Sequence, residues 1–143
     1  MMKLAVIDTD ILSWFFRGHE GVVSRFSSYL AVYDKINLSI ITYYEILSGL
    51  KYKDARKQLS TFLAFAKCNN IILLTEESVA RSAEVYAQMR RQGTPVDDID
   101  LLIAGVALVN DWVLVTHNTK HFGQIPNLQI EDWYHVGVEP AVL

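Results

Sequence analysis

Short apolar runs alternate with longer amphipathic stretches along the chain. Short unbroken apolar runs are typical of strands buried on both faces, whereas apolar positions that recur every three or four residues are typical of helices. The expected strands are residues 4–7, 37–42, 71–74 and 112–115, with an edge strand at 128–130. The expected helices are residues 10–17, 19–33, 43–50, 53–69, 76–92 and 97–110. This alternation predicts βαβ units around a mainly parallel sheet.

Acidic or amide side chains stand at or just beyond the ends of several expected strands. Asp8 ends the first strand, Glu45 lies near the start of the helix after the second, and Asn118 follows the fourth. Asp100 lies in the first turn of the helix at 97–110, which is otherwise apolar on every side and is expected to be almost wholly buried. In a parallel sheet these positions share one edge.

Carboxylates gathered at one edge repel each other, and some of them stay protonated unless a cation joins them. A hard divalent ion with oxygen ligands, Mg²⁺ or Mn²⁺, suits such a group. Zinc is not expected there, because no cluster of cysteine and histidine accompanies the acids.

The same acids also have a purely structural interpretation. Thr42 and Glu45 have the spacing of a capping box, and Asp10 is placed to cap the first helix. Asp97 or Asp98 is placed to cap the helix at 97–110. Residue spacing does not decide between a cap and a metal ligand at these positions.

Composition indicates one folded domain, residues 1–143, because 51% of the residues are hydrophobic and 20% are charged. No apolar run approaches the roughly 18 residues of a membrane span. The single cysteine, Cys68, excludes an internal disulfide, favours a cytoplasmic location and is expected to be a buried thiol. A mean hydropathy of +0.18 favours a dimer or partner interface.

The formal net charge of −3 argues against indiscriminate binding of nucleic acid. One basic run could nevertheless hold phosphates beside an acidic metal site. It comprises Lys51, Lys53, Arg56 and Lys57. His117 and His121 are expected to be surface residues of a loop, and the tail beyond Trp133 carries no informative pattern.

Five segments, in this order, resemble the PIN-domain ribonucleases of the VapC toxin type. They are residues 6–13 (VIDTDILS), 38–49 (LSIITYYEILSG), 93–104 (GTPVDDIDLLIA), 114–122 (LVTHNTKHF) and 128–133 (LQIEDW). The resemblance implies a three-layer α/β/α sandwich with a mostly parallel sheet. It also implies a homodimer whose RNA-cleaving activity a small antitoxin protein inhibits.

The resemblance further implies which residues act in Mg²⁺-dependent hydrolysis of RNA. It makes Asp8, Glu45 and Asp100 the metal ligands, and Asn118 stands where many relatives carry a fourth acid. Three other side chains could orient the ligands or help them. They are Thr9, Thr116 and Asp98.

Two rival functions are compatible with parts of the sequence. A phosphatase of the haloacid-dehalogenase type would use Asp8 as its nucleophile, although Ile11 stands where that class has a glycine. A PIN-like module that binds RNA or a partner without cleaving RNA is the other rival, and the neutral Asn118 leaves it open.

Overall fold

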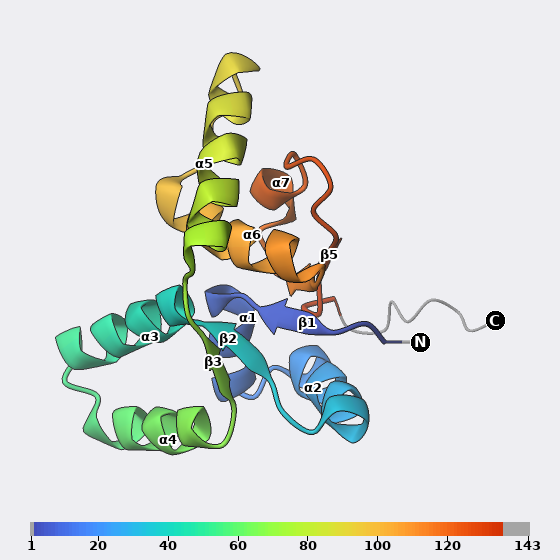
Figure 1. The fold of residues 1–143 in the computed structure, drawn as a ribbon. Coiled ribbons are helices and arrows are strands. Elements are labelled where there is room, and N and C mark those ends of the chain that lie inside the picture. The colour runs from blue at the N-terminus through green and yellow to red at the C-terminus, as the bar shows by residue number, and fades with distance from the viewer. Residues whose placement is uncertain (1, 136–143) are drawn as a thin grey trace.

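The computed structural model describes residues 2–135, in which short strands are connected by helices (Figure 1). The strands are β1 (Ala5–Ile7), β2 (Asn37–Ser39), β3 (Asn70–Ile72), β4 (Val113–Val115) and β5 (Ile130–Glu131). The helices are α1 (Thr9–Phe16), α2 (Glu20–Tyr33), α3 (Ile40–Tyr52), α4 (Arg56–Lys67), α5 (Glu76–Arg91), α6 (Asp98–Asn110) and α7 (Thr119–Phe122).

Every strand pair in the described part of the chain is parallel, which confirms the predicted sheet direction. Strand β4 lies between β1 and β5, with Val113 opposite Ala5, and β2 pairs with β3. The buried Asn37 side chain connects β2 to β1, because its Nδ2 donates to the carbonyl of Ala5 over 3.0 Å. The strands therefore follow the spatial order β5-β4-β1-β2-β3.

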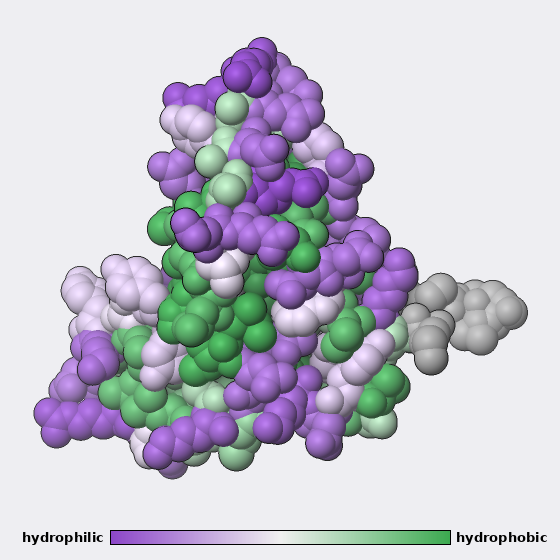
Figure 2. All heavy atoms as spheres, in the orientation of Figure 1, coloured by the Kyte–Doolittle hydropathy of each residue, from purple (hydrophilic) through white to green (hydrophobic). Residues whose placement is uncertain are grey.

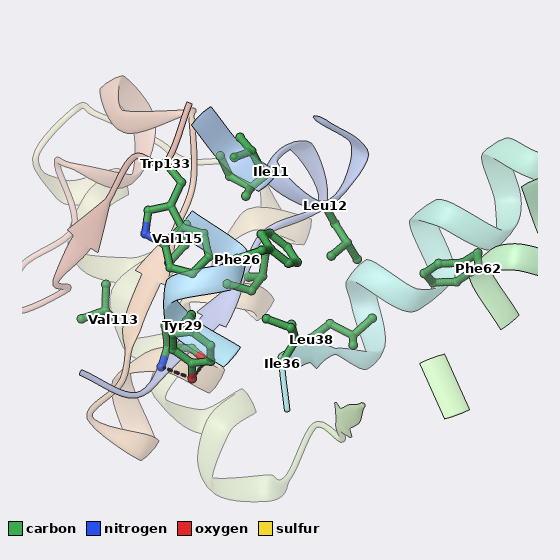
Figure 3. Close-up of a cluster of buried hydrophobic side chains, with 13 residues drawn as sticks. Ile11, Leu12, Phe26, Tyr29, Ile36, Leu38, Phe62, Val113, Val115 and Trp133 are labelled. Carbon is green, nitrogen blue, oxygen red and sulfur yellow. Dashed lines mark hydrogen bonds between the residues drawn. The ribbon is translucent and has the colours of Figure 1, made fainter. Parts of the chain in front are cut away.

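Alternate residues of β1 and β4 pack into two separate hydrophobic cores, as the period of a strand requires. Val6 and Leu114 face the core that α5, α6 and α7 cover. Ile7 and Val115 face the core of α1, α2 and the buried Trp133 (Figure 3). Two helical layers thus enclose the sheet, which confirms the three-layer α/β/α sandwich.

Strand β2 ends earlier than the sequence predicts. Its last residue, Ser39, caps α3 by accepting a hydrogen bond from the Thr42 amide over 3.0 Å. Ile40 and Ile41 are apolar and β-branched, so they resemble a continuing strand, but they form the first turn of the helix. The alternative of a capping box at Thr42 and Glu45 is therefore wrong, because Ser39 is the cap.

Three further expectations need correction. His121, expected in a loop, lies in the four-residue helix α7, which is too short to show helical periodicity in the sequence. Strand β5 begins two residues later than expected. Cys68, expected to be buried, is exposed at the end of α4.

Apolar surface remains on the outside of the molecule. Figure 2 shows hydrophobic side chains gathered over the place where β3 leads into α5. Leu73 and Val79, from that part of the chain, are 64% and 42% exposed. Within residues 2–135, none of the helices combines the length and the apolar character that a bilayer crossing requires.

Candidate active site

Asp8 ends β1 and at the same time caps α1. Its backbone amide continues the pairing with β4 by donating to Val115 O over 2.9 Å. Its carboxylate accepts hydrogen bonds from the Thr9 amide and the Thr116 hydroxyl, each over 2.8 Å. The side chain is buried, with 6% of the residue exposed. The cap assigned to Asp10 as an alternative thus belongs to Asp8, two residues earlier.

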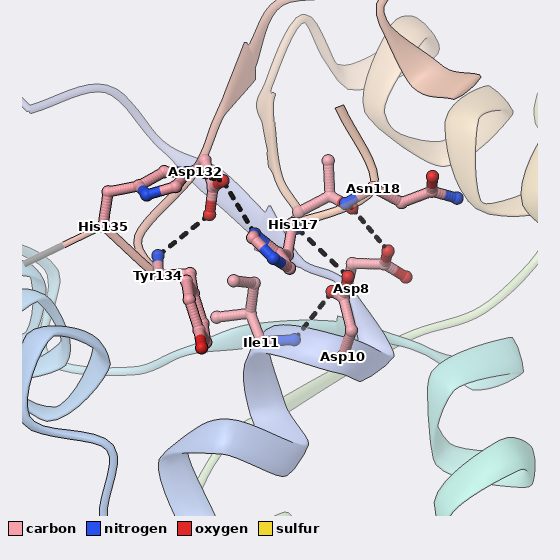
Figure 4. Close-up of polar contacts among 9 residues, drawn as sticks. Asp8, Asp10, Ile11, His117, Asn118, Asp132, Tyr134 and His135 are labelled. Carbon is pink, nitrogen blue, oxygen red and sulfur yellow. Dashed lines mark hydrogen bonds and ion pairs between the residues drawn. The ribbon is translucent and has the colours of Figure 1, made fainter. Parts of the chain in front are cut away.

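Asp10 lies beside Asp8 in the first turn of α1. Its two carboxylate oxygens accept from the amides of Ile11 over 2.7 Å and of His117 over 3.1 Å (Figure 4). Asp10 was not among the predicted site residues, because the sequence explained it equally well as a cap. Its separation of two residues from Asp8 at the end of a strand was the available signal.

Glu45 is held against the start of α1 by Thr9. The Thr9 hydroxyl donates to Glu45 Oε1 over 2.5 Å and lies 3.0 Å from the hydroxyl of the buried Thr42. This contact joins the first turn of α1 to the start of α3. The side chains that follow β1 and β2 therefore lie in the same region.

Helix α6 brings Asp100 to the same region. Asp97 caps the helix by accepting from the Ile99 amide over 3.0 Å, Asp98 is exposed, and Asp100 is half-buried. The helix is fixed on α5, because the Ser82 hydroxyl donates to the carbonyl of Leu101 over 2.7 Å. Of the two alternatives for this cap, the structure selects Asp97.

The carboxylates act on one another electrostatically. Burial, and then the charge of Asp10, raises the pKa of Asp8 from 3.8 to about 7. Burial and the charges of Asp97 and Glu45 raise the pKa of Asp100. Burial also raises the pKa of Asp10, against the lowering effect of its hydrogen bonds from Ile11 and His117. These directions show acids gathered close enough to repel.

The loop after β4 supplies the contacts that hold two of these acids. The buried Thr116 hydroxyl donates to Asp8 and accepts from the Asn118 amide over 3.0 Å. The backbone amide of His117, which lies between Thr116 and Asn118 in the chain, donates to Asp10. Asn118 begins α7 without a capping hydrogen bond from its side chain. The loop therefore fixes Asp8 and Asp10, while the side-chain amide of Asn118 makes no capping hydrogen bond to α7.

A divalent ion that keeps some of its water ligands fits this group better than an ion bound by protein atoms alone. Among residues 2–135, Asp8, Glu45 and Asp100 do not form a trio whose ligand oxygens all lie within 4.8 Å of one another. Mg²⁺ usually keeps several waters and is held by one or two carboxylates. The donors are all oxygens, and a cation would offset the repulsion that raises the pKa values of Asp8 and Asp100.

The basic run lies at the opposite end of α3 from the acids. Lys51 follows Glu45 by six residues, which corresponds to about 9 Å along the helix axis. Lys53 and Lys57 line a hollow of about 600 Å³ between α1, α3 and α4, and Arg17 also borders it. Arg56 pairs with Asp54 over 3.0 Å on the surface. Lys53 and Lys57 are thus the members of the run that share a concave surface.

Comparison with known proteins agrees with this architecture. The family model of the PIN domain matches residues 5–128. Ribonuclease VapC1 of Haemophilus influenzae is 27% identical over 129 residues, which cover 90% of this chain and 96% of the relative. The tRNA(fMet)-specific endonuclease VapC of Salmonella typhimurium is 31% identical over 97 residues, which cover 67% of this chain and 74% of that protein.

A solved structure of DNA-bound VapBC from Salmonella typhimurium has the same fold. It aligns with a TM-score of 0.81 at 27% sequence identity, covering 92% of this chain and 99% of the matched chain. The resemblance noted in the sequence is thereby confirmed. The chain belongs to the PIN-domain family, and within it to the VapC ribonucleases of toxin–antitoxin systems.

Proposed function

We propose that this chain is a Mg²⁺-dependent endoribonuclease, active also with Mn²⁺, and the toxin of a toxin–antitoxin pair. The observation that carries the proposal is the buried Asp8 carboxylate, which Thr9 and Thr116 hold and whose pKa is raised by burial and by the charges of Asp10 and Asp100. A structural cap alone does not need Asp10, Glu45 and Asp100 beside it, because one carboxylate satisfies the end of α1.

In this proposal Asp8, Asp100 and Glu45 hold the cation. Mg²⁺ bound there supplies Lewis-acid stabilisation of the charge that develops on the scissile phosphate. Thr116 keeps Asp8 turned toward the site, and Thr9 does the same for Glu45, so the carboxylates are oriented before the ion binds. Asn118 contributes a neutral amide at the rim, and Asp98, exposed at the start of α6, is a weaker helper.

RNA is the proposed substrate, in keeping with the names of the relatives. Lys53 and Lys57 are the proposed contacts for the phosphates that flank the cleaved bond, because both line the same hollow. Lys51 and Arg56 are exposed and extend this basic surface. The specificity for tRNA(fMet) in the name of the Salmonella relative makes tRNA the first substrate to test.

An antitoxin protein and a second copy of the chain are the proposed partners, in the cytoplasm. The hollow between α1, α3 and α4 combines the apolar side chains of Phe16, Leu50 and Phe62 with basic ones, which suits a peptide segment of mixed character. The exposed apolar surface where β3 leads into α5 supports the homodimer (Figure 2).

A cleavage assay with tRNA, in the presence of Mg²⁺ or of a chelator, tests the proposal. We expect cleavage only with the divalent ion, and none with Asp8→Asn or Asp100→Asn. Binding of RNA without cleavage by the folded wild-type protein would support the non-cleaving module instead. The phosphatase alternative is already overturned by membership of the PIN-domain family.

A further inference from the structure

A second group of potential metal ligands lies on the other side of the loop after β4. His117 Nδ1 lies 2.9 Å from Asp132 Oδ2, and His135 Nε2 lies 3.2 Å from the same oxygen (Figure 4). In residues 2–135, this is the one set of three histidine, cysteine or acidic residues whose ligand atoms all lie within 4.8 Å. None of these three residues was a predicted metal ligand.

The three side chains are held in place by further contacts. The other oxygen of Asp132 accepts from the Tyr134 amide over 2.9 Å, which leaves Oδ2 directed at the histidines. The centroid of the Tyr134 ring lies 4.2 Å from that of the His117 ring. The same ring stacks on His19, with 4.3 Å between the ring centroids. The Asp132 side chain is 12% exposed and that of His135 is 61% exposed, so the group is anchored inside and open outside.

We propose that His117, Asp132 and His135 form a binding site for a borderline transition-metal ion such as Zn²⁺, separate from the group of acids around Asp8. Zinc binds imidazole nitrogen and carboxylate oxygen at about 2.0–2.2 Å, so neighbouring ligand atoms of a tetrahedral site lie roughly 3.3 Å apart. The observed separations of 2.9 and 3.2 Å from Asp132 Oδ2 are close to this spacing. Solvent supplies the fourth position beside His135.

The ligand chemistry distinguishes this site from the group of acids around Asp8. Two imidazoles and one carboxylate favour zinc, copper or nickel, whereas the oxygen-only donors of the acids favour Mg²⁺ or Mn²⁺. The inference does not depend on the proposed nuclease activity, because it concerns binding alone. An ion at the site would tie the segment after β5 to the loop whose amide holds Asp10.

Titration with Zn²⁺, and with Co²⁺ as a spectroscopic probe, tests the site in the presence of excess Mg²⁺. We expect one equivalent of Zn²⁺ to bind the wild-type protein. His135→Ala and His117→Ala should each lower the affinity by about tenfold or more. His121→Ala removes an exposed histidine of α7 outside the group and serves as the matched control, and Asp8→Asn should also retain binding.

Thermal unfolding gives a second readout, because an ion that binds only the folded state raises the melting temperature. Saturating Zn²⁺ should raise the melting temperature of the wild type by about 3 °C or more, and that of His135→Ala by less. Absence of Zn²⁺ binding, unchanged affinity in His135→Ala, or loss of binding in Asp8→Asn would each overturn the site. The first result would leave only the contacts between the histidines and Asp132, and the last would place the ion among the acids around Asp8.

Discussion

The loop from Thr116 to Asn118 separates two regions with opposite charge arrangements. On one side, Asp8 and Asp10 lie with Glu45 and Asp100 nearby. Burial raises the pKa values of Asp8, Asp10 and Asp100, and the charges of neighbouring acids raise those of Asp8 and Asp100 further. On the other side, a single acid, Asp132, lies between two imidazoles. In the first region the acids outnumber the nearby imidazoles, and the charges of His117 and His121 lower the pKa values of Asp10 and Asp100, whereas the second region pairs its one acid with two imidazoles.

The two regions therefore differ in what a bound cation would change. Among the acids around Asp8 a cation would offset the repulsion, so removing one acid should both abolish function and relieve that repulsion. In the histidine group the side chains already pair with one another, so removing one should weaken ion binding without relieving repulsion.

The largest expected effect is on catalysis. Asp8→Asn or Asp100→Asn should lower metal-dependent RNA cleavage by about a thousandfold, because each removes a carboxylate that would hold the ion. Asp111→Asn is the matched control, since Asp111 is an exposed acid at the opposite end of α6 whose left-handed conformation asparagine tolerates. Cleavage rates measured on one RNA would check the prediction, and near-normal rates in folded Asp8→Asn would contradict it.

The second effect is on the pH dependence of stability without divalent ions. The pKa of Asp8 is 3.8 in the reference state and about 7 in the fold, so the folded protein binds this proton more tightly. The contribution of Asp8 to the free energy of unfolding is therefore fully present below about pH 4 and is lost as the pH rises through 7.

Asp8→Asn removes this pH-dependent loss. At pH 8 and without divalent ions, the variant should exceed the wild type in free energy of unfolding by up to about 4 kcal/mol, with the difference shrinking toward pH 4. Urea unfolding at both pH values would measure it. A variant less stable than the wild type at pH 8 would favour a purely structural cap.

A smaller effect is expected for the residue that orients Asp8. Thr116→Val removes the hydroxyl that donates to Asp8 and accepts from the Asn118 amide, so cleavage should fall by about tenfold or somewhat more. Thr116→Ser keeps the hydroxyl and should retain most of the activity. Equal rates for the valine and serine variants would show that this hydrogen bond does not position the carboxylate.

The smallest effect is expected at the basic hollow. Lys53→Ala and Lys57→Ala should each weaken RNA binding by a few fold and reduce the salt dependence of binding by about one ion. Lys67→Ala, at the far end of α4, is the control. Binding curves at two salt concentrations would check this, and an equal loss in Lys67→Ala would remove the hollow from the proposed RNA contacts.

The sequence predicted the elements that have a long hydrophobic pattern or whose contacts are with residues close by in the chain. The apolar helix at 97–110 and the acid Asp100 in its first turn were readable, because burial on all sides leaves a clear signature. The end of β2 was not readable, because Ile40 and Ile41 suit a strand as well as a helix and only the cap from Ser39 decides.

The histidine group was unreadable for a different reason. Asp132 lies 15 residues after His117, and these residues meet only because β5 pairs in parallel with β4 and the chain turns back beyond it. The tail after Trp133 therefore carried no pattern, although Tyr134 and His135 make defined contacts. Asp10 was ambiguous because a cap and a site residue have the same position at the start of a helix.

The most direct test is to measure the binding of Mn²⁺ to the metal-free protein by electron paramagnetic resonance or calorimetry. We expect the wild type to bind Mn²⁺, Asp8→Asn and Asp100→Asn to lose most of that affinity, and His135→Ala to retain it. Equal Mn²⁺ binding by the wild type and Asp8→Asn would contradict the claim that these carboxylates form a cation site.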